Sequence, residues 1–163
     1  MGILKIITKP DADGMYLENV VNYIVHGHSI ITGGFNICPE CALEQMQIVK
    51  NYYGKTGGNG LVHFIVSFNR NVYSIMYAEK SARKIAKYYA DRYQILYAVH
   101  AEPRTNSRGE VVNLLHVHLL MNSVSFVDGS EYQDNIKEAK KFAKHIAEMT
   151  GDSRWKICFG DGT

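Results

Sequence analysis

Three histidines carry the clearest chemical signal in the sequence. His116 and His118 lie two residues apart in an apolar segment, 112–124, that is typical of a β-strand. Alternate side chains of a strand point to opposite faces of a sheet, so these two imidazoles and Asn122 share one face. His100 lies on the preceding predicted strand. If the two strands pair antiparallel, His100 reaches the same face, and the three imidazoles could hold one metal ion.

An acidic residue accompanies this cluster. Glu102 follows His100 by two positions and therefore shares its face. Its carboxylate could ligate the metal, orient an imidazole from behind, or accept a proton. The alternative is that the histidines lie on a solvated sheet face and bind nothing. Two imidazoles at this spacing, with a third on the neighbouring strand, favour the metal site.

The elements that must position these residues follow from hydrophobic periodicity. Apolar and β-branched runs predict strands over 4–8, 61–68, 94–102 and 112–124, with an edge strand at 155–159. Helical spacing predicts amphipathic helices over 17–24, 42–53, 82–93 and 131–149. Glycines in 26–34 and 54–60 predict loops. This order indicates an α+β fold, an antiparallel sheet covered by helices.

Length and composition place the chain among ordinary globular proteins. Its 163 residues fit one domain, spanning 1–163, and its net charge of +2 is only mildly basic. No apolar run approaches the roughly 20 residues that cross a bilayer, and the N-terminus is too short and polar for a signal peptide. The three cysteines, an odd number, then favour reduced thiols and a cytoplasmic setting.

The histidine segment His-Val-His-Leu-Leu-Met-Asn, 116–122, resembles the His-hydrophobe-His motif of HUH endonucleases. The form ending in Asn is typical of plasmid mobilisation relaxases of the MobA/VirD type. Three earlier segments are similar to that family in its own order. Residues 20–24 resemble the segment with the nucleophilic tyrosine, 63–68 the strand ending in Ser-Phe, and 100–102 the His followed by an acid. The resemblance covers about residues 17 to 127.

This resemblance implies an enzyme that nicks one strand of supercoiled DNA at an origin of transfer and later rejoins it, as in bacterial conjugation. Tyr23 would attack the scissile phosphate and stay joined to the 5′ end. The phosphotyrosine preserves the bond energy, so resealing needs no ATP. His100, His116 and His118 would hold Mg²⁺ or Mn²⁺, although three imidazoles would also accept Zn²⁺, Ni²⁺ or Co²⁺ in vitro. Accessory relaxosome proteins and a coupling protein are the expected partners.

Other residues receive roles by the same resemblance. Tyr16 is the nearest competitor of Tyr23 as nucleophile, whereas Tyr52 and Tyr53 are expected to be core or surface aromatics. Departures from the family concern the acid, where Glu102 replaces the usual Asp, and the long connection between His100 and His116. The chain also stops soon after the nuclease domain, so we expect it to lack the C-terminal extension of a full-length relaxase. The side chains expected to contact DNA are His63, Ser67, Arg70 and Asn122.

Weaker signals leave alternatives open. Cys38 and Cys41 form a lone Cys-x-x-Cys that could bind zinc with His26 and His28, or act as a redox pair, although plain reduced cysteines are favoured. Basic positions at 80–87 and 137–144 could be solvated helix faces or a DNA track. Other functions for the fold are a rolling-circle replication initiator, a single-strand transposase, a non-catalytic DNA-binding module, and a metal-dependent hydrolase that uses water.

Overall fold

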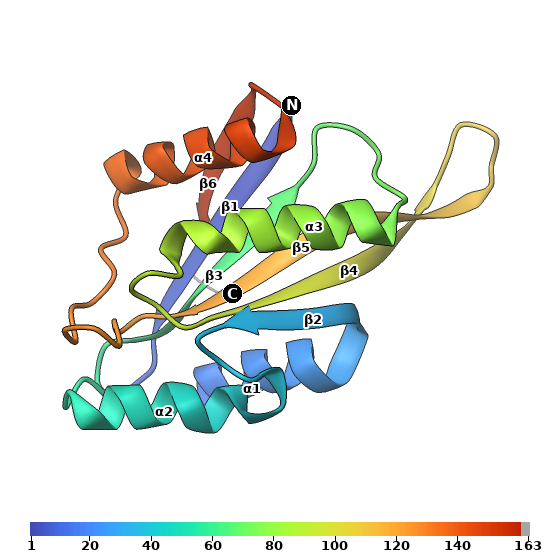
Figure 1. The fold of residues 1–163 in the computed structure, drawn as a ribbon. Helices are drawn as coiled ribbons and strands as arrows, with labels where there is room; N and C mark the ends of the chain where they lie inside the picture. The colour runs from blue at the N-terminus through green and yellow to red at the C-terminus, as the bar shows by residue number, and fades with distance from the viewer. Residues whose placement is uncertain (161–163) are drawn as a thin grey trace.

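A computed structural model describes residues 1–160 of the chain. Its centre is a six-stranded sheet with helices on both faces, in the spatial order β2-β4-β5-β3-β1-β6 (Figure 1). The strands are β1 (Gly2–Pro10), β2 (Ser29–Phe35), β3 (Asn59–Ser67), β4 (Ile95–Thr105), β5 (Val111–Asn122) and β6 (Trp155–Gly160). The α-helices are α1 (Met15–Tyr23), α2 (Ala42–Tyr52), α3 (Ile75–Ala86) and α4 (Ile136–Thr150). Short helical turns are η1 (Ile24–His28), η2 (Pro39–Cys41) and η3 (Lys87–Tyr89).

The predicted α+β architecture is confirmed, with one departure in strand direction. Four of the five strand pairs are antiparallel, and β6 joins β1 in parallel at one edge of the sheet. The parallel pair arises because α4 carries the chain back across the sheet before β6 begins. The sheet is therefore mixed, not wholly antiparallel.

Each face of the sheet has its own core. Helices α3 and α4 lie on one face and α1 and α2 on the other (Figure 1). The larger core joins α3 and α4 to one set of alternating strand side chains, among them Phe64, Val117 and Leu119. The smaller core joins α1 and α2 to the other set, Leu61, Leu96, Ala98 and Leu120. His116 and His118 alternate with Val117, so the histidines lie on the face of α1 and α2.

The predicted loop over residues 26–34 is wrong, because residues 26–28 belong to η1 and the following residues to a strand. Ser29–Phe35 forms β2, the edge strand that pairs antiparallel with β4. Its glycines serve close packing and not a turn: a Cβ on Gly33 would collide with the ring of Tyr97, and one on Gly34 with Ile37. Glycine in a strand often marks such an approach, and the sequence pattern alone resembles a loop.

We expect Gly33→Ala to lower the free energy of unfolding by about 1–3 kcal/mol, because the methyl group must displace a buried tyrosine. Gly57→Ala is the matched control, since a Cβ there meets nothing within 4 Å. Chemical denaturation of both variants measures the difference. Equal stabilities would contradict the packing role of Gly33.

Helix α4 begins later than its periodicity predicts. The predicted start at residue 131 shifts to Ile136 because the side chain of Asn135 caps the helix by accepting a hydrogen bond from the Glu138 backbone N–H at 3.0 Å. Tyr132 stays outside the helix but is buried in the larger core. Its apolar ring is therefore part of the core without being part of α4.

A buried lysine ties α2 to the sheet. Lys50 is 7% exposed, and its ammonium donates hydrogen bonds to the carbonyl of Asn59 at 3.0 Å and to Ser123 Oγ at 2.7 Å. Burial lowers the pKa of Lys50 to about 8, against the opposing charge of Asp11. The folded protein therefore releases this proton more readily than the unfolded chain.

This pKa shift predicts that Lys50 makes stability rise with pH. Between about pH 8 and 10.5 the unfolded chain binds more protons at this position, so the free energy of unfolding increases by about 2–3 kcal/mol over that window. Lys50→Met should lack this increment, while Ser123 Oγ still bonds to the Asn59 carbonyl at 2.6 Å. Urea titrations at several pH values compare the two proteins. Parallel pH profiles would refute the assignment.

Candidate metal centre and nucleophile

The pairing of β4 with β5 brings the three predicted histidines together. The two strands pair without interruption from Ile95↔Met121 to Thr105↔Val111, which places His100 directly opposite His116. His118 lies one step along the same face, opposite Ala98. One ligand atom from each imidazole lies within 4.8 Å of the others, and His100 and His118 are buried.

The spacing of these nitrogens fits a metal ion. His116 Nε2 and His118 Nε2 are 2.9 Å apart, and the His100 and His118 ring centroids are 4.1 Å apart. Ligand atoms bound to one ion at about 2.0–2.1 Å lie about 3 Å from each other. The three side chains can therefore serve as ligands with little movement. Among the residues that the structure describes, this is the one cluster of three or more His, Cys, Asp or Glu with such spacing.

A fourth histidine stands behind the triad. His63 on β3 is diagonal to His118 across the β3–β5 pair, and its Nε2 lies 2.7 Å from His118 Nδ1. A hydrogen bond at Nδ1 leaves His118 Nε2 as the nitrogen that faces His116. His63 was predicted to contact DNA, and the structure shows in addition that it contacts His118.

A serine on β2 has the equivalent position next to His100. Ser29 Oγ donates a hydrogen bond to the Ile24 carbonyl at 2.7 Å and lies 2.9 Å from His100 Nε2. The Ser29 hydroxyl proton is donated to the Ile24 carbonyl, so Ser29 Oγ accepts a hydrogen bond from His100 Nε2–H. In a neutral His100, the nitrogen that carries the lone pair is then Nδ1. Sequence analysis missed Ser29 because its strand was taken for a loop.

The surroundings lower the pKa values of His63, His116 and His118. Burial lowers the pKa of His118 to about 2, and the neighbouring histidines act in the same direction. Burial also lowers the pKa of His63 to about 4 and that of His116 below its usual value, while the Glu102 carboxylate opposes the shift at His116. A neutral imidazole is the form that binds a metal. His116 and His118 could therefore bind a cation without first losing protons near neutral pH.

Tyr23 lies beside the triad at the end of α1. Its ring is 6.0 Å from the His100 ring, edge to face, and its side chain is 52% exposed. Buried Val21 and Ile24 anchor the end of the helix in the smaller core. Tyr23 lies outside this apolar stripe of α1, so its side chain points away from the smaller core. It thus combines a fixed backbone with an accessible phenol next to the three histidines.

The competing tyrosines lie elsewhere. Tyr16 lies in the first turn of the same helix, two turns from Tyr23. It packs on the smaller core, and Lys9 Nζ is 5.4 Å from its ring centre. Burial raises the pKa of Tyr16, which makes its phenolate harder to form. Tyr52 is 80% exposed at the end of α2 and contacts Tyr53 edge to face. The assignment of Tyr23 as the nucleophile stays a prediction.

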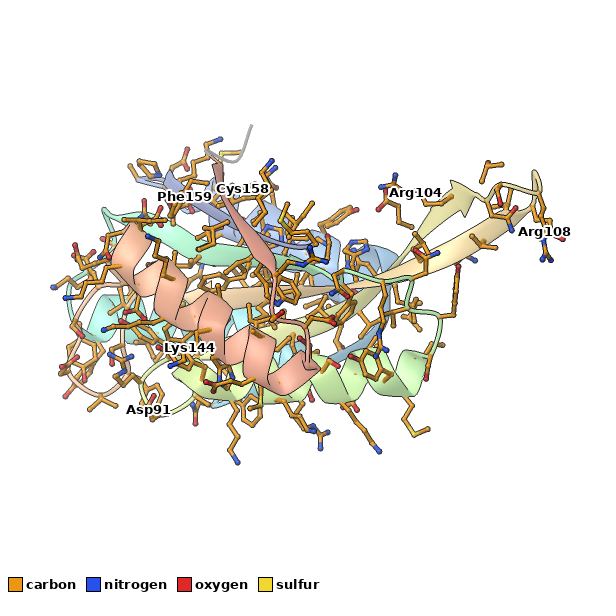
Figure 2. All side chains as sticks on the ribbon, turned by 90° about the horizontal axis from the view of Figure 1, so that it is seen from above. Asp91, Arg104, Arg108, Lys144, Cys158 and Phe159 are labelled. Atoms are coloured by element: carbon orange, nitrogen blue, oxygen red, sulfur yellow. The ribbon has the colours of Figure 1, made fainter. Side chains whose placement is uncertain are left out.

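A groove of about 260 Å³ adjoins the triad at His116. The groove is lined by, among others, Ser67, Arg70, Glu102 and Arg104. Ser67 and Arg70, which are predicted to contact DNA, therefore lie near His116. Glu102 pairs with Arg104 at 2.9 Å and stands next to His116. A role of Glu102 in proton transfer stays a prediction. Figure 2 shows Arg104 where the β4–β5 hairpin extends beyond the sheet toward Arg108.

Asn122 lies on the same face of the sheet as the triad, but it is buried and not exposed at the surface. The residue is 0% exposed, and its amide nitrogen donates to the Met46 carbonyl at 3.2 Å and to Gln94 Oε1 at 2.9 Å. Its Oδ1 accepts from the Val124 backbone N–H. Predicted to contact DNA, Asn122 instead fixes the end of β5 against α2 in this structure.

The weaker sequence signals lie away from the triad. Cys38 and Cys41 are exposed, and Cys38 Sγ donates to Glu40 at 2.9 Å, while the side chain of His28 lies outside the described part. The basic positions of α3 and α4 belong to helices that cover the opposite face of the sheet. A DNA strand held at the histidines would therefore not run along those helices.

Comparison with known proteins shows which family the chain belongs to. No described helix is long and apolar enough to cross a membrane. No curated protein and no solved structure matches the chain. A protein-family model does match, the relaxase family with a MobA/VirD2-like nuclease domain, over residues 16–155. That range contains Tyr23, the groove residues and all four clustered histidines, so the chain belongs to the relaxase family, whose nuclease domain nicks DNA in mobilisation.

Proposed function

We propose that this chain nicks one strand of DNA at an origin of transfer and rejoins it through a 5′-phosphotyrosine on Tyr23, which initiates conjugative mobilisation. The observation that carries the proposal is the Tyr23 ring 6.0 Å from His100, whose ligand nitrogen lies within 4.8 Å of those of His116 and His118. The proposed nucleophile and the proposed cation site are therefore neighbours.

The chemistry assigned to the chain is a transesterification. The Tyr23 oxygen forms a bond to phosphorus, its proton leaves, and the bond from phosphorus to the 3′ oxygen breaks, with a proton delivered to that oxygen. Glu102, on the groove beside His116, is the proposed proton acceptor. Reversal of the same steps reseals the strand.

His100, His116 and His118 would hold a divalent cation, Mg²⁺ or Mn²⁺ by family resemblance. When bound, the cation neutralises charge on the non-bridging oxygens of the phosphate. The donor set of three imidazoles fits this role, and burial lowers the pKa values of His116 and His118. Ser67 and Arg70, on the groove next to His116, would fix the neighbouring backbone of the strand.

The test is conversion of a supercoiled plasmid carrying a transfer origin to the open circle in the presence of Mn²⁺. After denaturation, we expect the protein to remain joined to the 5′ end of the nicked strand. Cleavage without such an adduct would favour a hydrolase that uses water. Binding without cleavage would favour a non-catalytic module. A nick confined to a replication origin would favour an initiator of rolling-circle replication.

A further inference from the structure

Part of the sheet face that carries the triad is left open by the helices. As far as the described residues go, the smaller core under α1 and α2 takes no side chain from β1 or β6. On this face Ile3, Lys5 and Lys156 are exposed and Cys158 is half-buried. The open surface formed by these four residues of β1 and β6 is called the lysine face below.

Strand register places the lysine face in line with the triad. Ile65 pairs with both His118 and Lys5, and Lys5 pairs with Cys158, so one row of side chains crosses β5, β3, β1 and β6. Neighbouring strands lie about 4.8 Å apart, so the backbone of Lys5 is about 10 Å from that of His118. Lys156 lies in the adjacent row, opposite Ile3. Cys158 and Phe159 mark this edge in Figure 2.

The charges on this part of the face have one sign. Among the described residues of β3, β1 and β6 whose side chains point to this face, there is no acid, and Lys5, Lys9 and Lys156 supply three positive charges. Exposed Ile3 and half-buried Ile65 add apolar surface beside Lys5. An anionic chain with apolar rings matches both properties, and single-stranded DNA is such a chain.

We propose that the lysine face binds the DNA strand a few nucleotides from the scissile phosphate. Lys5 and Lys156 would each neutralise one phosphate, and Ile3 would contact a base or sugar. Both lysines lie outside the range 16–155 that matches the family, so this contact belongs to the strands that flank the matched domain. The inference rests on the proposed function, because the triad must face DNA for the strand to continue across β1 and β6.

The test is the binding of a fluorescein-labelled, mixed-sequence 20-nucleotide single strand in EDTA, measured by anisotropy over a series of salt concentrations. Lys5→Ala/Lys156→Ala should weaken binding about tenfold at low salt. The slope of log affinity against log salt should fall by about 1.4, since each phosphate contact on a single strand contributes about 0.7. Lys80→Ala/Lys84→Ala removes the same charge from exposed positions on α3 and should change both quantities little.

A second measurement does not depend on the lysine variants. In a Cys38→Ser/Cys41→Ser background, Cys158 is the remaining thiol, and the oligonucleotide should slow its reaction with maleimide at least threefold. An unprotected thiol, or equal effects of the two double variants, would overturn the lysine face. So would a wild-type protein that binds no single strand.

These outcomes separate the inference from the proposed function. Lysine-independent binding combined with nicking of the plasmid would refute the lysine face alone. Lysine-dependent binding without nicking would refute the nicking activity alone. In an active protein, the double lysine variant should also raise KM and leave kcat unchanged, because the lysines contact the strand and not the reacting atoms.

Discussion

Tyr23→Phe is expected to abolish nicking, with a loss of about a thousandfold or more, because the variant lacks the oxygen that attacks phosphorus. The phenyl ring can keep the edge-to-face contact with His100, and the side chain is half-exposed, so the free energy of unfolding should change by less than about 0.5 kcal/mol. Open-circle formation and the covalent adduct should disappear together, while DNA binding stays near the wild-type level.

Tyr16→Phe is the matched control on the same helix. Tyr16 packs on the smaller core with Lys9 at its ring, two turns from the triad, so its variant should nick at close to the wild-type rate. An adduct that persists in Tyr23→Phe would assign the nucleophile to another tyrosine. Loss of the adduct with continued cleavage would make water the nucleophile and sink the phosphotyrosine mechanism.

The clustering of the three histidines could be predicted from the sequence because it depends on local rules. The period of two along a strand puts His116 and His118 on one face, and a hairpin brings β4 back beside β5 with His100 in place. No long-range information is needed beyond the pairing of two consecutive strands. Tyr23 was harder to place, since its position depends on how α1 docks on the sheet. The amphipathic helix predicted over 17–24 is confirmed, with Leu17, Val21 and Ile24 buried in the smaller core.

The parts that sequence reasoning missed depend on contacts between distant segments. The glycines of β2 resemble a loop until the ring of Tyr97 is placed against Gly33. From the sequence, Asn122 at the end of β5 could face either solvent or a helix. In the structure it faces α2, where its amide donates a hydrogen bond to the Met46 carbonyl. Likewise, the diagonal contact of His63 with His118 follows from the register of β3 against β5, which no local pattern encodes.

His63→Leu is expected to weaken Mn²⁺ binding about 10- to 100-fold, the usual effect of removing a side chain that orients a metal ligand. In the structure His63 Nε2 is 2.7 Å from His118 Nδ1, and the hydrogen bond directs His118 Nε2 toward the other ligands. Leucine fills similar space but accepts no hydrogen bond. Isothermal titration with Mn²⁺ measures the affinity, and His118→Ala, which lacks a ligand, should bind more weakly still.

The control is His63→Gln, whose amide oxygen can occupy the place of Nε2 and accept the same hydrogen bond. We expect it to retain Mn²⁺ affinity within about threefold of the wild type. Saturating Mn²⁺ should also restore much of the nicking rate of His63→Leu, because the nucleophile and the three ligands are intact. A merely structural role would give a different pattern, in which both variants lose stability and excess metal restores neither. Equal loss of affinity in His63→Gln and His63→Leu would therefore show that His63 does not act through His118.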